Sequence, residues 1–191
     1  MNEICFVTGN NNKLKEVQSL LSTYKIISLT DLSFFDDIPE TENTIRGNAF
    51  LKASFVNKKF NIDCFSDDTG LFIASLGGSP GVKSARYAGE NSDSEKNIEL
   101  VLKNLRNNKN RNAYFKTVIC LIKNDKTHYF EGKVYGTITR KRVGKDGFGY
   151  DPIFIPDGYD KTYSELSLNE KNAISHRGIA VNKLVNFLNG N

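Results

Sequence analysis

The sequence lacks any run of about 18 uninterrupted apolar residues, which is the minimum for a membrane-spanning helix. Its first residues, MNEICFVT, also lack the basic segment and the long apolar segment of a secretory signal. We therefore expect neither a membrane partner nor secretion. The 191 residues, of which 39% are hydrophobic and 25% charged, are typical of a soluble globular protein that needs no disulfide or metal to hold its core.

Histidine and cysteine are both scarce. His128 and His176 are the two histidines, and no CxxC or HxxxH spacing occurs, so a zinc site is not expected and any metal must be held by oxygen atoms. The cysteines are odd in number and widely spaced, and Cys5, Cys64 and Cys120 each lie in an apolar run. This pattern predicts buried thiols in a reducing cytoplasm rather than disulfides.

An excess of one charge is also missing. There are 26 Lys and Arg against 22 Asp and Glu, which leaves a net charge of +4. That excess is small for a nucleic-acid binder but compatible with an anionic ligand. The basic segments at residues 106–116 and 140–142 keep a noncatalytic nucleotide- or RNA-binding module as an alternative, although basic runs are usually solvated surfaces. We predict no nucleic-acid partner.

The pattern of apolar residues alternates between strand-like and helix-like segments. Strands are predicted at residues 3–8, 24–29, 64–74, 113–123 and 127–139. Helices are predicted over residues 14–21, from about Thr44, from a capping box at Ser92 to about Arg106, and from about Ser175. The first strand, helix and strand predict an α/β fold, and a hairpin turn at residues 124–126 makes the sheet mixed.

Three segments carry residues suited to chemistry. Residues 8–13, TGNNNK, join a strand to a helix, where backbone N–H groups and the helix dipole favour phosphate oxygens. The spacing of a Walker loop is absent, so an ordinary turn is the alternative. Asp67 and Asp68 interrupt an apolar strand, which costs free energy unless a cation neutralises them. Magnesium could do so with Glu40 or Glu42 and substrate phosphates, and an exposed turn is the alternative.

The third segment is the glycine-rich loop at residues 144–152. Phe148 and Tyr150 on this loop could stack on a purine or close the core. Further along, Lys171, His176 and Arg177 lie near the start of the last helix, where cations are disfavoured. This position predicts a local anionic or carbonyl partner for them.

Six motifs, in order, resemble those of the inosine triphosphate pyrophosphatases. They are TGNNNK (8–13), ETENT with NAFLKA (40–44 and 48–53), SDDTGL (66–71), PGVKSARYAG (80–89), GFGYDP (147–152) and SELSLNEKNAISHR (164–177). The resemblance implies an elongated mixed sheet with flanking helices and two lobes around a cleft, in a single domain over residues 1–191. It also implies a cytoplasmic homodimer that hydrolyses ITP, dITP and XTP to a nucleoside monophosphate and pyrophosphate.

The same resemblance assigns roles to individual residues. Glu40 and Asp68 would bind Mg²⁺, and Asp68 would also be the catalytic general base. The substrate-binding residues would be Thr8, Gly9, Asn10, Asn11, Asn12, Lys13, Thr69, Phe148, Gly149, Tyr150, Asp151, Lys171, His176 and Arg177, with Lys52 assisting. The sequence departs from the family pattern at Gly47, where Glu is common, and at Lys83, where Tyr is common. A related diphosphatase for pyrimidine nucleotides is the rival enzyme, but it would not share the GFGYDP and SHR motifs.

Overall fold

The computed structural model describes residues 2–190, and its strands form a mixed sheet in the order β2-β1-β3-β5-β6-β7, with β4 paired to β3. The strands are β1 (Asn2–Val7), β2 (Tyr24–Ile27), β3 (Cys64–Ile73), β4 (Pro80–Gly81), β5 (Asn112–Lys123), β6 (Lys126–Ile138) and β7 (Phe154–Pro156). β1 pairs in parallel with β2 and β3, whereas β4 pairs antiparallel with β3, and β7 with β6. The predicted mixed α/β sheet is confirmed.

The helices lie between and after these strands. They are α1 (Asn11–Leu20), α2 (Ile45–Phe60), α3 (Ser94–Asn104), α4 (Leu168–Ile174) and α5 (His176–Leu188). Short 3₁₀ helices are η1 (Ala74–Leu76), η2 (Ser84–Arg86), η3 (Asp151–Ile153) and η4 (Tyr163–Glu165). Over residues 2–190, no helix combines the length and the apolar character needed to cross a membrane.

The chain divides into two compact units. Unit 1 consists of Met1–Asp68, Thr117–Gly132 and Arg177–Asn191, and unit 2 of Thr69–Lys116 and Lys133–His176. The divisions fall inside β3, β5 and β6, so each of these strands contributes residues to both units. Each unit has its own apolar core.

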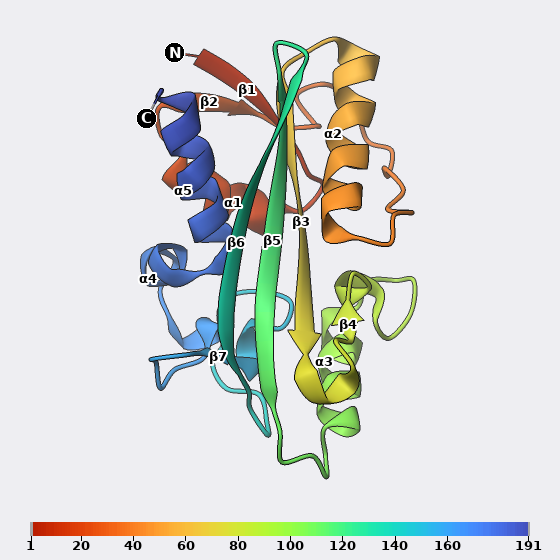
Figure 1. Cartoon of the computed structure of the whole chain (residues 1–191), viewed down its shortest axis with the longest axis vertical. Helices are drawn as coiled ribbons and strands as arrows, with labels where there is room; N and C mark the ends of the chain where they lie inside the picture. Colours follow the sequence, from red (N-terminus) through yellow and green to blue (C-terminus); the bar gives the residue numbers. More distant parts are fainter. Residues whose placement is uncertain (1, 191) are drawn as a thin grey trace. The chain divides into compact units, whose positions relative to one another are not determined.

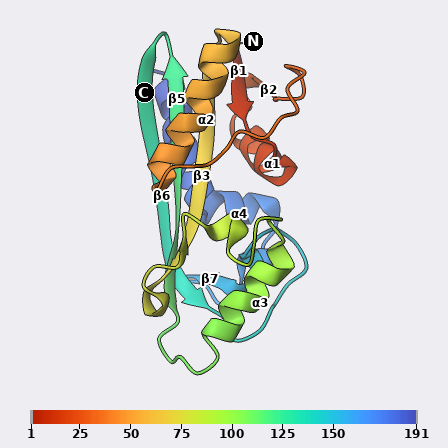
Figure 2. The same cartoon turned by 90° about the vertical axis from the view of Figure 1, so that its right-hand side faces the viewer.

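Helices cover both faces of the sheet in unit 1, with α1 and α5 on one face and α2 on the other (Figure 1). The strand period of two explains this arrangement, because successive side chains point to opposite faces. Ile4 and Phe6 of β1 pack with α1 and α5, while Cys5 packs with α2. Figure 2 shows α2 running alongside the strands that it covers. All three cysteines are free and buried on the α2 face, as predicted.

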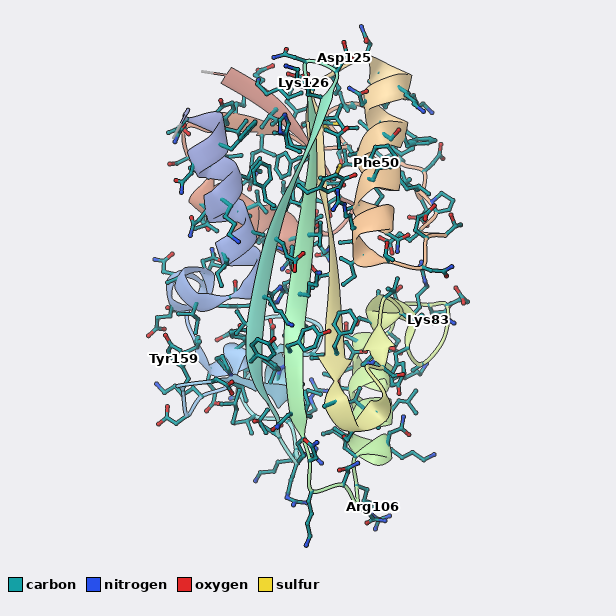
Figure 3. The ribbon with its side chains drawn as sticks, in the orientation of Figure 1. Phe50, Lys83, Arg106, Asp125, Lys126 and Tyr159 are labelled. Carbon is teal, nitrogen blue, oxygen red and sulfur yellow. The ribbon has the colours of Figure 1, made fainter. Side chains whose placement is uncertain are left out.

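The structure shows which residues cap the helices and form the hairpin turn. Thr44 caps α2 by accepting the N–H of Gly47, in agreement with the predicted start. The predicted capping box at Ser92 is wrong, because Asp93 is the residue that accepts the N–H groups of Glu95 and Lys96. The hairpin between β5 and β6 is confirmed, with Asp125 at a positive φ, and Figure 3 shows Asp125 and Lys126 at its tip.

Unit 2 buries its apolar residues between α3 and its strands. Ile98 and Val101 of α3 lie in one cluster with Leu71 and Ile73 of β3. The same cluster includes Tyr150, which comes from the glycine-rich loop. The loop at residues 144–152 is thereby attached to the core of unit 2.

Candidate active site

The segment Thr8–Lys13 connects β1 to α1, as the sequence predicts. Asn10 caps α1, and its side-chain oxygen accepts the N–H groups of Asn12 and Lys13 at 2.9 and 3.2 Å. The hydroxyl oxygen of Thr8 accepts the N–H of Asn10 at 3.1 Å. A Cβ added at Gly9 would have no neighbour within 4 Å, so the backbone is open on that side. The loop is therefore ordered by its own side chains and leaves room for a ligand beside its backbone.

Asp67 and Asp68 lie on opposite faces of β3. Asp67 shares the face of Phe65, which packs with α1 and α5, and its carboxylate contacts side chains of these two helices. Asp68 shares the face of Cys64, and its carboxylate contacts side chains of α2. The alternation of a strand thus separates two adjacent carboxylates and gives each its own partners.

Cations surround Asp67. The Nζ atom of Lys13 lies 3.0 Å from Asp67 Oδ1, and Nε of Arg177 lies 3.1 Å from Oδ2. The other end of Arg177 is held by Glu16, with NH1 2.5 Å from Oε2. Burial favours the neutral acid, but Lys13, Arg177 and Lys52 outweigh it and hold the pKa of Asp67 well below its usual range. Arg177 at the start of α5 therefore has the anionic partners that the sequence predicts.

Asp68 has a different environment on the α2 face. Asn48 donates from Nδ2 to Asp68 Oδ2 at 3.3 Å, and Nζ of Lys52 lies 3.9 Å from Oδ1. Lys52 also donates to Glu40 Oε1 at 2.6 Å and to the carbonyl oxygen of Asp67 at 2.8 Å. Burial raises the pKa of Asp68 to about 6, and the cations Lys52 and Lys13 oppose that rise. A carboxyl group with this pKa is suited to accept a proton near neutral pH.

The departure at Gly47 has a steric explanation. A Cβ added to Gly47 would lie 2.8 Å from the Cβ of Glu42 and 2.9 Å from Oγ1 of Thr44. Glu42 therefore crosses the space that a longer side chain at position 47 would need. Since Glu40 is the residue that shares Lys52 with Asp68, the structure favours Glu40 over Glu42 as the acidic partner of Asp68.

In unit 2, Asp151 and Lys171 contact each other. Lys171 Nζ lies 2.5 Å from Asp151 Oδ2, which also accepts the backbone N–H of Phe148 at 2.8 Å. The same Nζ atom lies 4.7 Å from the ring centre of Phe148. Gly147 has a φ of 80°, and a Cβ there would collide with the Asp151 carboxylate. The ion pair therefore fixes the conformation of the glycine-rich loop.

The other predicted residues of unit 2 differ in exposure. Tyr150 is 6% exposed, and its hydroxyl donates to the carbonyl oxygen of Ser84 at 2.8 Å, so its ring belongs to the core. Phe148 is the partly exposed aromatic residue of this pair. The His176 ring is buried and stacks on Phe115, with ring centres 4.5 Å apart. Thr69 is partly exposed on β3.

Comparison with known proteins adds a family to this geometry. A family model described as the Ham1 family matches residues 4–187. The chain belongs to the Ham1 family. The dITP/XTP pyrophosphatase of Flavobacterium psychrophilum is 51% identical to it over 186 residues, which are 97% of this chain and 98% of that protein. The structure of a HAM1 protein from Coxiella burnetii matches with a TM-score of 0.91 at 40% identity, covering 100% of both chains. The Staphylococcus aureus Ham1 protein matches with a TM-score of 0.89 at 40% identity, covering 99% of both.

In this Ham1 chain, the predicted site residues form two groups, one in each unit. Unit 1 holds Thr8, Gly9, Asn10, Asn11, Asn12, Lys13, Glu40, Lys52, Asp68 and Arg177, and unit 2 holds Thr69, Phe148, Gly149, Tyr150, Asp151, Lys171 and His176. The prediction did not include Glu16 or Asn48, which the structure adds to the first group. For Glu16 a signal existed in the spacing, because it lies three residues after Lys13 and therefore on the same side of the helix.

Proposed function

We propose that this chain hydrolyses dITP, ITP and XTP to the nucleoside monophosphate and pyrophosphate. The observation that carries the proposal is the difference in surroundings between the two adjacent aspartates of β3. Asp67 is neutralised by Lys13 and Arg177 beside the phosphate loop, whereas Asp68 has a pKa raised to about 6. A phosphate-binding group thus lies next to a proton acceptor, which is what hydrolysis of a phosphoanhydride needs.

The residues of unit 1 act on the phosphates and on water. Thr8–Lys13 present backbone N–H groups and one ammonium group to the triphosphate. Asp68 accepts a proton from a water molecule while the oxygen of that water forms a bond to the α-phosphorus. The bond from that phosphorus to the bridging oxygen then breaks, and pyrophosphate leaves. Lys52 lies near Asp68 and Glu40 and stabilises their negative charges.

The acidic residues near Asp68 fit a magnesium ion. Over residues 2–190, no group of three or more His, Cys, Asp and Glu side chains could enclose a metal. Glu40 and Asp68 offer oxygen atoms, the ligands that Mg²⁺ prefers, and Mg²⁺ is usually held by one or two carboxylates together with substrate phosphates. These two residues would hold the ion, which when bound supplies positive charge against the phosphates.

We assign recognition of the base to Phe148 and, following the family resemblance, to His176 and Arg177. Phe148 offers its ring for stacking, since Tyr150 is committed to the core. His176 and Arg177 donate hydrogen bonds to the 6-oxo group of the purine, whereas the 6-amino group of adenine is itself a donor. Sites that depend on such polar complementarity can discriminate by roughly 10⁴-fold. Asp151 and Lys171 support this role by fixing the loop that carries Phe148.

We further propose that the protein is a cytoplasmic homodimer. The family resemblance of the sequence supports the dimer, and three reduced, buried thiols are what a reducing compartment favours. Sedimentation equilibrium of the purified protein tests the dimer, and a single species at the monomer mass contradicts it.

One assay tests the function. Purified protein is incubated with ITP, dITP, XTP and ATP in the presence of Mg²⁺, and pyrophosphate and orthophosphate are measured separately. We expect pyrophosphate from the first three and little turnover of ATP. Orthophosphate as the primary product, or ATP cleaved as fast as ITP, contradicts the proposal. A parallel series with a chelator in place of Mg²⁺ tests the metal, and full activity there excludes it.

A further inference from the structure

Four side chains of alternating charge form a series of three ion pairs in unit 1, which we call the charge series. Lys13 contacts Asp67 at 3.0 Å, Asp67 contacts Arg177 at 3.1 Å, and Arg177 contacts Glu16 at 2.5 Å. Lys13 and Glu16 are three residues apart on α1, so they lie on one side of that helix. The charge series therefore begins and ends on α1 and includes one residue of β3 and one of α5.

Three members of the charge series are buried and Lys13 is partly buried, so the attraction between neighbouring charges is only weakly screened by water. Glu16 is 3% exposed, Asp67 1% and Arg177 2%. A buried charge that loses its partner is costly, so these groups stay together. Lys13, Asp67 and Arg177 each have a part in the proposed function, whereas Glu16 has none.

We propose that Glu16 is a positioning residue for the reaction, and that it keeps Lys13 in place through Arg177 and Asp67. The inference rests on the proposed function, in which Lys13 binds phosphate. Arginine prefers to bind both oxygens of a carboxylate at once. Glu16 holds one end of the guanidinium and so leaves Asp67 Oδ1 for the ammonium group of Lys13. Without Glu16, Arg177 takes both oxygens of Asp67 and displaces Lys13.

Electrostatics alone predicts the opposite effect. Replacing Glu16 with Gln removes a negative charge near a phosphate-binding lysine, and this change by itself strengthens the binding of an anion. Displacement of Lys13 weakens the same binding. The direction of the change therefore separates a positioning role from a simple charge effect.

The experiment compares Glu16→Gln with Val17→Ala. Val17 is the next residue of α1 and packs in the core, so its truncation weakens the packing of the helix but removes no member of the charge series. Steady-state kinetics with ITP and calorimetric titration with magnesium pyrophosphate are measured for both variants. We expect Glu16→Gln to raise the KM for ITP and the Kd for pyrophosphate roughly tenfold, with kcat changed less than about threefold. Val17→Ala should lower the Tm and leave both constants at their wild-type values.

A double-mutant cycle tests the route through Arg177. In Arg177→Met, the additional change Glu16→Gln should have no further effect on KM, because Glu16 acts through the missing guanidinium. Additive effects contradict the proposal, as do an unchanged or lowered KM in Glu16→Gln and a KM that rises equally in Val17→Ala. If Glu16→Gln does not fold, Glu16→Asp keeps the charge but shortens its reach, and it should raise KM in the same way.

The outcomes also separate this inference from the proposed function. A wild-type protein that hydrolyses ITP and binds pyrophosphate, with a Glu16→Gln variant that does so equally well, overturns the positioning role alone. A wild-type protein that neither hydrolyses ITP nor binds pyrophosphate overturns the proposed function, and the positioning role with it.

Discussion

Each unit of the molecule contains a lysine that contacts a buried aspartate, and the two pairs have different surroundings. In unit 1, Asp67 is shared between Lys13 and Arg177, and Glu16 extends the chain of charges. In unit 2, Asp151 is held by Lys171 and by the N–H of Phe148, and the aromatic ring of Phe148 lies beside the ammonium group. One pair belongs to a network of charges, and the other to a loop.

The difference indicates two uses of the same interaction. Charges in such a network can change partners when an anion arrives, because Asp67 and Arg177 each contact two groups of opposite sign. A pair that also binds the backbone of a loop stabilises one conformation of that loop instead. We therefore expect mutations of the first pair to affect ligand binding, and mutations of the second to affect stability.

The largest expected effect is that of Lys171→Met. It removes the ammonium group from a carboxylate that is 4% exposed, and we expect the free energy of unfolding to fall by about 3 kcal/mol, as for other broken buried pairs. Urea denaturation measures the change. Lys25→Met, which breaks the exposed pair with Glu3, is the control and should cost less than about 1 kcal/mol. Equal losses in the two variants would contradict the assignment of Lys171 to the loop.

Asp68→Asn should separate activity from stability. Turnover of ITP should fall about 100-fold or more, because the proton acceptor is lost. The Tm should stay the same or rise, because burial already disfavours the charged form of this group and raises its pKa to about 6. Release of pyrophosphate and thermal unfolding are the two measurements. Near-normal activity of the folded variant rules out the role of general base.

Gly147→Ala tests whether the backbone conformation at residue 147 contributes to the stability of the glycine-rich loop. The residue has a φ of 80°, and a Cβ there meets the carboxylate of Asp151, so the ion pair must shift. We expect a loss of about 2 kcal/mol in the free energy of unfolding, in the range for strained backbone positions. Gly158→Ala is a matched control, since it also has a positive φ but open space around it. If both variants lose the same stability, the contact with Asp151 contributes nothing.

Lys13→Met should have the smallest effect on stability. Asp67 keeps Arg177 as a partner, so we expect a loss of about 1 kcal/mol, well below that of Lys171→Met. The KM for ITP should nevertheless rise roughly tenfold or more, because a phosphate-binding charge is gone. Urea denaturation and steady-state kinetics measure the two effects. A loss of stability as large as that of Lys171→Met would remove the contrast between the two pairs.

Local patterns sufficed to predict most of the elements. The strand period, the start of a helix near Thr44 and the turn at residues 124–126 are local features, and the structure confirms them. The helix α4 was missed, although Ser167 and Glu170 form a capping box, because its seven residues are too short for a clear apolar period. Asp93 rather than Ser92 caps α3, and two neighbouring candidates of this kind are hard to separate by pattern alone.

The contacts among the residues of the candidate site could not be predicted from the sequence. Adjacent aspartates in an apolar strand indicate that cations must be near, and magnesium is the first cation that the pattern suggests. The structure supplies Lys13, Lys52 and Arg177, which come from three different helices. Such partners are distant along the chain, so no local pattern could identify them. Tyr150 shows the same limit, since only the packing of unit 2 places its ring in the core.

The position of Asp67 and Asp68 on opposite faces of β3 has a consequence for sequence change. Insertion or deletion of one residue between Cys64 and Asp67 would move every later side chain of the strand to the other face. The carboxylate that accepts a proton would then face α1 and α5, and its neighbour would face α2. Related proteins can therefore vary in length at the hairpin turn or in surface loops, but this short stretch of β3 must keep its number of residues.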